Sequence, residues 1–339
     1  MQDFLKFYGI KPDEFTIAPL GNGLINNTRI VKMCNEDKSY VLQKINTNVF
    51  KVPENIACNI ELISTFLQKN NPNYFFAAPI KTIDGKQMVN TIDGYYRLFP
   101  FVKESYTIDV ATTPEQAYEA SKQFAKFTKE LIGFDASSLK ITLPDFHNLS
   151  LRFKQFELAL ITGNKERIED VKKLSKYLLE QKNIVDEFKK LKNDFRVRVA
   201  HHDTKISNVL FYKEDKGLCV IDLDTIMPGY FISDVGDMMR TYLCPVSEEE
   251  SDFTKIEIRL AFYKAIVEGY KSEMGEELTE AEMQSFLFAG KYMIYMQALR
   301  FLTDYIMNDV YYGCKYPKHN LVRAGNQAEL LKRLQEFTP

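Results

Sequence analysis

The sequence changes character near residue 102, and this change limits the folds that are open to the chain. In the first hundred residues, short strand-like runs alternate with turns. After that point, apolar residues recur mostly at helical spacing in long segments. A β-rich part followed by a helical part predicts an α+β protein of two lobes, with a small N-terminal lobe at residues 1–101, a larger, mostly helical lobe at 102–339 and a hinge at 100–105.

These patterns place the individual elements. Strands are predicted at residues 15–20, 27–33, 40–45, 87–92 and 95–101, and a helix at 54–69. Further helices are predicted at residues 114–132, 149–162, 165–191, 253–274 and 281–310. A short strand-rich stretch at 196–240 interrupts the helical part, and it holds the residues with the clearest chemical pattern.

Composition excludes several classes of function. The chain of 339 residues has a net charge of -2, whereas a dedicated nucleic-acid binder is usually basic. Its five cysteines are an odd number and form no Cys-x-x-Cys pair, which favours reduced thiols in the cytoplasm. Neither a signal-peptide pattern nor an apolar run of about 18 residues occurs. We therefore expect a cytoplasmic monomer that binds neither nucleic acid nor membrane.

The loop at residues 201–208, His-His-Asp-Thr-Lys-Ile-Ser-Asn, lies between two strand-like runs. Asp203 and Asn208 have the spacing of the kinase pattern H-x-D-x-x-x-x-N, and Asp222 and Asp224 follow the next apolar run. Phosphoryl transfer needs one carboxylate to take the proton of the acceptor hydroxyl, and further oxygen ligands to hold Mg²⁺ on the phosphates. Each residue alone also fits a turn cap or a strand end, but their order and spacing favour phosphoryl transfer.

Three blocks of sequence resemble the aminoglycoside phosphotransferase and choline kinase superfamily. They are the loop at 201–208, Val-Ile-Asp-Leu-Asp-Thr-Ile-Met-Pro-Gly at 220–229, and Asp-Val-Gly-Asp at 234–237, whose two aspartates we expect to tie the loop to a helix beneath it. The second block is most similar to the N-acetylhexosamine 1-kinase branch, as are residues 23–26, 40–46, 146–153 and 300–323. The resemblance implies a protein-kinase-like two-lobe fold, ATP and Mg²⁺ as cofactors, and a small-molecule sugar as the acceptor.

The resemblance also implies roles for individual residues. Asp203 would be the catalytic base, and Lys205 would contact the transferring phosphate. Asn208 and Asp222 would hold Mg²⁺, and Asp224 would shape the same metal site.

The ATP phosphates are expected to lie under the turn that follows the first strand, where Gly21, Gly23 and Asn26 come close together. Glycines let the backbone approach an anion closely and turn its N–H groups toward it. A Gly-x-Gly turn between strands is, taken alone, more often only a hairpin.

The third strand departs from the kinase pattern V-A-I-K, because Gln43 stands where that pattern has its lysine. Either Gln43 makes a neutral contact with a phosphate, or Lys44, which points to the opposite face of the strand, is recruited by a bulge. Glu61 on the following helix is the candidate partner for a cation here. Phe101, at the hinge, completes the predicted nucleotide site.

Substrate contacts are predicted on the last helical segment. Arg300, Asp304 and Tyr311 stand four and seven residues apart, which places them on one face of a helix. Arg300 and Asp304 also suit a simple helical ion pair, but the similarity to the sugar kinases favours sugar contacts. The leading hypothesis is phosphorylation of the anomeric hydroxyl of an N-acetylhexosamine. The alternatives are a kinase for choline, homoserine or an aminoglycoside, and a nucleotide-binding pseudokinase that serves as an interaction module.

Overall fold

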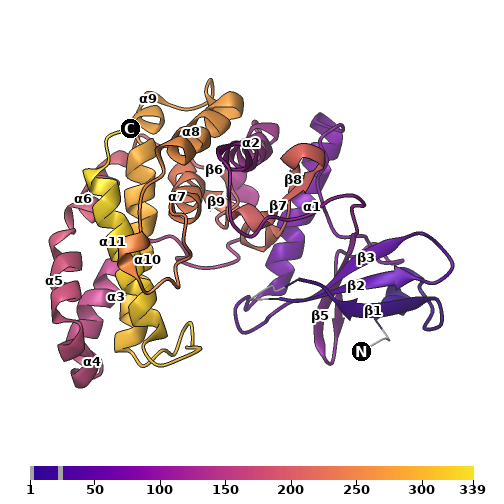
Figure 1. The fold of residues 1–339 in the computed structure, drawn as a ribbon. Coiled ribbons are helices and arrows are strands. Elements are labelled where there is room, and N and C mark those ends of the chain that lie inside the picture. Colours follow the sequence, from indigo (N-terminus) through magenta and orange to yellow (C-terminus); the bar gives the residue numbers. More distant parts are fainter. Residues whose placement is uncertain (1–3, 22–25) are drawn as a thin grey trace.

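The computed structural model describes residues 4–21 and 26–339 and shows a small sheet lobe beside a larger helical lobe (Figure 1). The small lobe holds a five-stranded antiparallel sheet in the order β1-β2-β3-β5-β4. Its strands are β1 (Phe15–Pro19), β2 (Asn27–Met33), β3 (Ser39–Lys44), β4 (Val89–Thr91) and β5 (Gly94–Pro100), preceded by a short 3₁₀ helix (Leu5–Tyr8). The five strands predicted from the sequence are therefore present.

The two faces of this sheet meet different surroundings. Leu42 lies opposite Leu98 in the ladder, and both belong to a small apolar core with Phe15 and Val31. Successive residues of a strand point to opposite faces, so the residues between these core positions, such as Gln43, face away from that core. Gln43 of β3 and Arg97 of β5 therefore lie together on the face of the sheet that points away from this core.

Helix α1 (Pro53–Asn70) connects the sheet lobe to the helical lobe. Pro53 stands in the first turn, where a missing N–H group costs no helical hydrogen bond. Ile56, Ile60 and Ile63 recur at helical spacing, are fully buried, and belong to the core that the helices of the large lobe share. The helix therefore anchors the sheet to the larger lobe.

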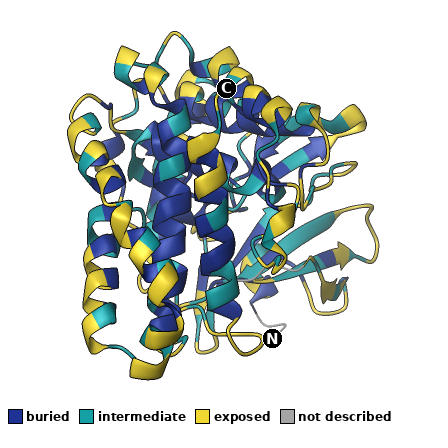
Figure 2. Ribbon diagram, turned by 60° about the vertical axis from the view of Figure 1, so that its left-hand side comes forward, coloured by how far each residue is buried: buried dark blue, intermediate teal, exposed yellow. Residues whose placement is uncertain are grey.

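The larger lobe is a helical bundle around α10, which is buried along almost its whole length. Figure 2 shows buried helices at its centre and helices with one exposed face around them. Its long helices are α2 (Pro114–Glu130), α3 (Leu149–Thr162), α7 (Phe231–Tyr242), α8 (Leu260–Met274), α10 (Phe286–Ile306) and α11 (His319–Glu336). Of these, α7 and α11 were not among the predicted helices.

Three of the predicted helices are wrong in extent. The segment 165–191 is three short helices, α4 (Lys165–Asp170), α5 (Lys172–Glu180) and α6 (Asn183–Leu191), because the chain bends at the buried Val171 and again at residues 181–182. The pieces α5 and α6 bury apolar residues in the same core, and α4 packs the partly buried Ile168 against it, so the periodicity continues across the bends. The segment 253–274 begins with a 3₁₀ turn (Phe253–Lys255), and 281–310 divides into α9 (Glu280–Gln284) and α10.

Two small antiparallel sheets of two strands each complete the large lobe and carry the candidate site. Strand β6 (Arg198–Ala200) pairs with β9 (Met227–Gly229), and β7 (Val209–Tyr212) pairs with β8 (Lys216–Val220). The loop 201–208 joins β6 to β7, and Asp222 follows the end of β8. The predicted α+β architecture of a small β-rich lobe and a larger helical lobe is confirmed, while the boundary between residues 101 and 102 stays a prediction.

No helix in the described ranges is long and apolar enough to cross a membrane.

Candidate active site

The loop that carries Asp203 is shaped by its two histidines. His202 has a φ of 65°, a left-handed conformation that residues other than glycine seldom adopt. The buried ring of His201 donates from Nε2 to the Ile221 carbonyl at 2.9 Å, and its Nδ1 accepts the backbone N–H of Asp203 at 3.4 Å. Burial lowers the pKa of His201, which favours the neutral ring that these two contacts require.

Two buried aspartates of α7 hold the same loop from below. The Asp234 carboxylate accepts the backbone N–H groups of His201 and His202 at 2.9 and 2.8 Å. Asp237 accepts the N–H of Thr204 at 2.9 Å. The expectation that these aspartates tie the loop to a helix is confirmed by these contacts. Burial raises the pKa of Asp234 to about 6.

Asp203 and its neighbours form the predicted catalytic group. The Asp203 carboxylate lies 3.2 Å from the Lys205 ammonium, and this negative charge raises the pKa of Lys205. The Asn208 side chain donates from Nδ2 to the Asp203 carbonyl at 2.8 Å. Within the described part of the chain, the Asn208 side-chain oxygen accepts no hydrogen bond. It therefore remains available as a metal ligand.

Asp222 lies directly after β8 in a left-handed conformation, with a φ of 59°. Strain of this kind persists where the surrounding structure fixes a side chain in one direction. Burial of the carboxyl group, with the nearby charges of Asp224 and Asp203, raises the pKa of Asp222 to about 7, against the opposing effect of Arg97 and Lys205. A carboxylate in such surroundings is stabilised by a cation.

The raised pKa of Asp222 predicts how stability depends on pH. Since this pKa rises from 3.8 to about 7, the folded protein binds the proton more tightly than the unfolded chain does. The free energy of unfolding should therefore fall as the pH rises through this interval, and Asp222→Asn should remove part of that fall. Urea unfolding of both proteins at several pH values, in the absence of metal, measures the free energy of unfolding. Curves for the two proteins that run parallel would contradict the prediction.

Asp224, predicted to shape the metal site, contacts the sheet lobe. Its Oδ1 lies 2.5 Å from Nη1 of Arg97 on β5, and both side chains are almost fully buried. Its Oδ2 accepts a hydrogen bond from Asn26 at 2.7 Å. The Asn26 side-chain oxygen in turn accepts the backbone N–H of Asn46 at 3.0 Å. These contacts join the two lobes, and they occupy the carboxylate of Asp224.

The other predicted nucleotide residues are spread over the sheet lobe. Gly21 is exposed with a φ of 68°, and Gly23 lies outside the described residues. The Phe101 backbone N–H donates to the Ser39 carbonyl at 3.1 Å, at the end of the sheet. The Glu61 carboxylate pairs with Lys81 at 2.7 Å, and so its cation comes from a loop rather than from the third strand.

The Gln43 side chain pairs with an arginine of the neighbouring strand β5. Its side-chain oxygen accepts hydrogen bonds from Nε and Nη2 of Arg97 at 3.1 and 2.7 Å. Lys44 projects to the other face of the sheet, where its ammonium lies 5.6 Å from the centre of the Tyr96 ring. The ladder between β3 and β5 is regular through these positions, so the bulge that would recruit Lys44 is absent.

The predicted substrate residues come together, although not on one helix face. Helix α10 ends at Ile306, and Asn308 and Asp309 reverse the chain with φ values of 67° and 58°. Tyr311 therefore lies beyond the helix, and the expectation of one shared helical face is wrong. The Tyr311 hydroxyl still accepts from Nη2 of Arg300 at 3.4 Å.

Asp304 stabilises the turn that brings Tyr311 into contact with Arg300. Its carboxylate accepts the backbone N–H groups of Tyr311 and Tyr312 at 2.7 and 2.9 Å, and a hydrogen bond from Asn320 at 3.1 Å. The simple helical ion pair between Arg300 and Asp304 is not formed. A sugar contact by Asp304 stays a prediction, and its buried carboxylate is already engaged by these donors.

Arg300 lies among aromatic rings. Its guanidinium is 5.3 Å from the centre of the Phe146 ring, 5.7 Å from that of Tyr311 and 5.4 Å from that of Tyr312. Phe146 stacks on His147, with 4.3 Å between ring centres. The His147 ring contacts Ser233 and lies 3.3 Å from the His202 ring, nitrogen to nitrogen. A continuous chain of contacts thus connects the Arg300 cluster to the catalytic loop.

Sequence reasoning missed two buried polar residues at the lobe junction. One is Arg97, whose position in the apolar run at 95–99 is a signal, because a charged residue inside a strand needs a partner. The other is Asn59 on α1, which is fully buried and donates to the Lys140 and Ile226 carbonyls at 2.8 and 2.9 Å. The signal for Asn59 in the sequence is an asparagine on the apolar face of a predicted helix.

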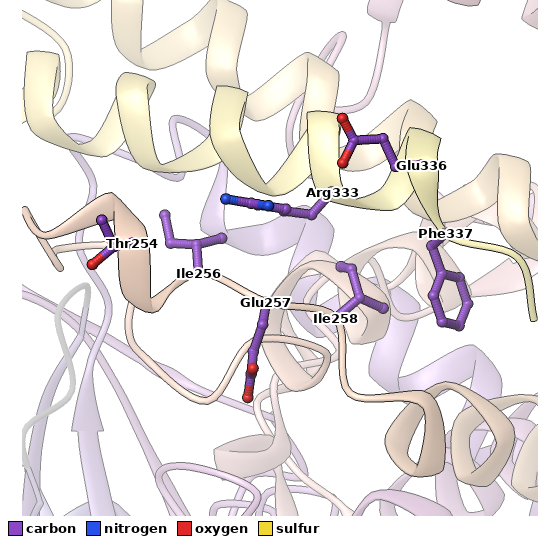
Figure 3. A pocket seen from close by; sticks show the side chains of 7 residues that line it. All are labelled: Thr254, Ile256, Glu257, Ile258, Arg333, Glu336 and Phe337. Carbon is purple, nitrogen blue, oxygen red and sulfur yellow. The ribbon is translucent and has the colours of Figure 1, made fainter.

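A cavity of about 380 Å³ lies elsewhere on the helical lobe, between the segment 254–258 and the end of α11 (Figure 3). It is lined by residues of that segment, such as Ile256 and Ile258, and by Arg333 and Phe337 at the end of α11. None of the candidate catalytic, nucleotide or substrate residues lines this cavity. It plays no part in the site described here.

The donor set at Asp222 fits a magnesium ion that also binds phosphates. Mg²⁺ prefers oxygen ligands and is usually held by one or two protein side chains together with substrate phosphates and water. Asn208 and Asp222 offer such oxygens. No group of three or more His, Cys, Asp or Glu side chains suited to a metal occurs among residues 4–21 and 26–339.

The loop that carries Asp203 follows a strand, Asp222 follows the next hairpin, and a small sheet lobe is joined to both. This arrangement is typical of a kinase-like phosphotransferase. The chain belongs to the phosphotransferase enzyme family, whose sequence model matches residues 16–275. This membership confirms the expected enzyme class. The narrower N-acetylhexosamine branch is part of the proposal below.

Solved structures share this fold along nearly the whole chain. A microcompartment-associated aminopropanol kinase has a TM-score of 0.65 and 14% identity, over 99% of this chain and 95% of its own. A spectinomycin phosphotransferase in complex with ADP and spectinomycin has a TM-score of 0.62 and 15% identity, over 99% and 98%. An ethanolamine kinase from Plasmodium vivax has a TM-score of 0.58 and 14% identity, over 96% and 87%. The expected kinase-like fold is thereby confirmed.

Proposed function

We propose that the protein transfers the γ-phosphoryl group of ATP to the anomeric hydroxyl of an N-acetylhexosamine, which gives the sugar 1-phosphate. The observation that carries the proposal is the Arg300 cluster, where a guanidinium lies over three aromatic rings and pairs with no carboxylate of the described residues. A sugar offers hydroxyl and acetamido oxygens beside an apolar ring face, which suits such a surface. The similarity of residues 220–229 to the N-acetylhexosamine 1-kinases supports the same acceptor.

In the proposed mechanism, Asp203 orients the acceptor hydroxyl and takes its proton as the new P–O bond forms. An anomeric hydroxyl is more acidic than an ordinary alcohol, so a carboxylate base suffices. Lys205, 3.2 Å from Asp203, lies ready to contact the transferring phosphoryl group. Asn208 and Asp222 would hold Mg²⁺, which, when bound, offsets the negative charge of the phosphates.

A second candidate acceptor is a cationic amino alcohol, since the structural neighbours include an ethanolamine kinase and an aminopropanol kinase. A cationic acceptor needs carboxylates that face it. Two carboxylates beside the aromatic cluster are engaged, because Asp304 binds backbone N–H groups and Glu248 lies between Arg240 and Arg323. The charge around Arg300 therefore favours a neutral or anionic acceptor.

The acceptor is tested by measuring ADP release with a panel of acceptors: N-acetylglucosamine, N-acetylgalactosamine, choline, ethanolamine, homoserine and spectinomycin. We expect turnover with an N-acetylhexosamine and none with its 1-O-methyl glycoside, in which the reacting hydroxyl is blocked. Turnover of the methyl glycoside would contradict an anomeric acceptor. Turnover confined to an amino alcohol would favour the second candidate.

A pseudokinase remains the non-enzymatic alternative. It predicts measurable ATP binding without ADP release for any acceptor. The complete set of Asp203, Asn208 and Asp222 supports an active enzyme instead.

A further inference from the structure

We propose that Arg97 supplies the positive charge that kinases of this fold place beside the nucleotide phosphates with a lysine of the third strand. Gln43 stands at the lysine position of that strand, and so the cation has to come from another residue. The inference rests on the use of ATP proposed above, and it is independent of the identity of the acceptor.

The register of the sheet places the Arg97 side chain in the region that a lysine at position 43 would reach. Arg97 on β5 lies directly opposite Gln43 on β3 in the antiparallel ladder. Residues that lie opposite each other in such a ladder project to the same face, with their Cβ atoms close together. The guanidinium of Arg97 therefore reaches the same space as a side chain at position 43, from the neighbouring strand.

Gln43 serves as the support of this arginine. Its carbonyl oxygen accepts from both Nε and Nη2 of Arg97, at 3.1 and 2.7 Å, and its amide donates to Thr28 at 3.3 Å. A lysine at position 43 has no acceptor and would repel the guanidinium. Glutamine at 43 and arginine at 97 are thus a matched pair, which explains why the usual lysine is absent.

The other end of the Arg97 guanidinium points at the larger, helical lobe. Nη1 lies 2.5 Å from Oδ1 of Asp224, which follows the candidate metal ligand Asp222 by two residues. Only 1% of Arg97 is exposed. Although Nη1 and Oδ1 are close enough for an ion pair, neither makes an aligned hydrogen bond with any of the described residues. A phosphate oxygen held at the neighbouring metal site would supply an aligned acceptor for Nη1.

Other cations of the sheet lobe do not take this place. Lys44 lies on the opposite face of β3, against Tyr96. Lys81 pairs with Glu61 at 2.7 Å, and half of each side chain is exposed. Among the described residues of the sheet lobe, Arg97 is the cation that contacts the segment after Asp222.

The test compares direct binding of ATP, ADP and adenosine to the wild type, Arg97→Met, Arg97→Lys and the double variant Gln43→Lys/Arg97→Met, by titration calorimetry. Arg97→Met should weaken ATP and ADP binding about tenfold to a hundredfold, and leave adenosine binding unchanged, because adenosine has no phosphate. The double variant, which moves the cation back to the third strand, should recover most of the loss. Lys44→Met is the matched control and should bind like the wild type.

Two outcomes would overturn the proposal. An equal loss of affinity for adenosine and ATP would show that Arg97 only joins the lobes through Asp224. Unchanged ATP affinity in Arg97→Met would show that the phosphates do not need this charge. If Arg97→Met fails to fold, Arg97→Lys and the double variant decide, since both keep a buried cation opposite Asp224. Because binding is measured without any acceptor, an error in the proposed sugar would leave these results unaffected.

Discussion

Asp203→Asn is expected to lower turnover about a thousandfold while the affinity for ATP stays unchanged. An asparagine keeps the shape of the side chain and its hydrogen bond to the acceptor hydroxyl, but it cannot take the proton. The nucleotide contacts proposed above do not involve this carboxylate. Single-turnover rates with saturating ATP and acceptor measure the first effect, and titration calorimetry with ATP measures the second.

The loop itself should survive this change. Among the described residues, the Asp203 carboxylate pairs only with Lys205, whereas the path of the loop is fixed by Asp234, Asp237 and the backbone carbonyl of residue 203. Asp93→Asn, in an exposed turn of the sheet lobe, makes the same chemical change away from the site and should keep full turnover. Normal turnover in the Asp203 variant would remove this residue from its proposed role as base.

The catalytic loop could be predicted from the sequence because its pattern is local. The spacing of Asp203, Asn208 and Asp222 is fixed by one loop and one hairpin, so the order along the chain already implies nearness in space. The same holds for the strands of the small lobe, whose alternation and turns are read over a few residues. Local patterns of this kind can be interpreted without any knowledge of tertiary contacts.

The partner of Gln43 could not be predicted in this way. It lies 54 residues away, and only the register between β3 and β5 brings the two side chains together. The sequence showed that a lysine was missing, but not which residue replaces it. Asp224 illustrates the same limit, because the family resemblance implies that it shapes the metal site but does not reveal its contacts with Arg97 and Asn26.

The closeness of Arg300 and Tyr311 was predicted for a partly incorrect reason. Helical periodicity extended the last predicted helix past residue 306, because Val310 and Tyr311 continue an apolar pattern. The chain reversal depends on Asp304, whose carboxylate binds two backbone N–H groups beyond the helix. A side chain that binds backbone several residues later can end a helix without proline or glycine. The residues still meet, but across a turn.

Asp222→Ala is expected to weaken the binding of ATP in the presence of Mg²⁺ about a hundredfold, which corresponds to about 2.7 kcal/mol. The proposed role of Asp222 is to hold the metal that bridges to the phosphates, so its loss should act on binding as well as on turnover. Without Mg²⁺, the same variant should bind ATP as well as the wild type or better, since a negative charge near the phosphates is gone. Calorimetric titrations with and without Mg²⁺ give both values.

The comparison with Asp224→Ala makes this prediction specific. Asp224 is paired with the buried Arg97, so its removal leaves a buried charge unpaired and should cost about 3 to 5 kcal/mol of stability. Asp222 forms no ion pair with a described residue and its pKa is already raised, so its removal should leave the metal-free protein at least as stable at neutral pH. Thermal unfolding of both variants measures this contrast. An Asp222 variant whose ATP affinity keeps the full response to Mg²⁺ would assign the metal to other ligands.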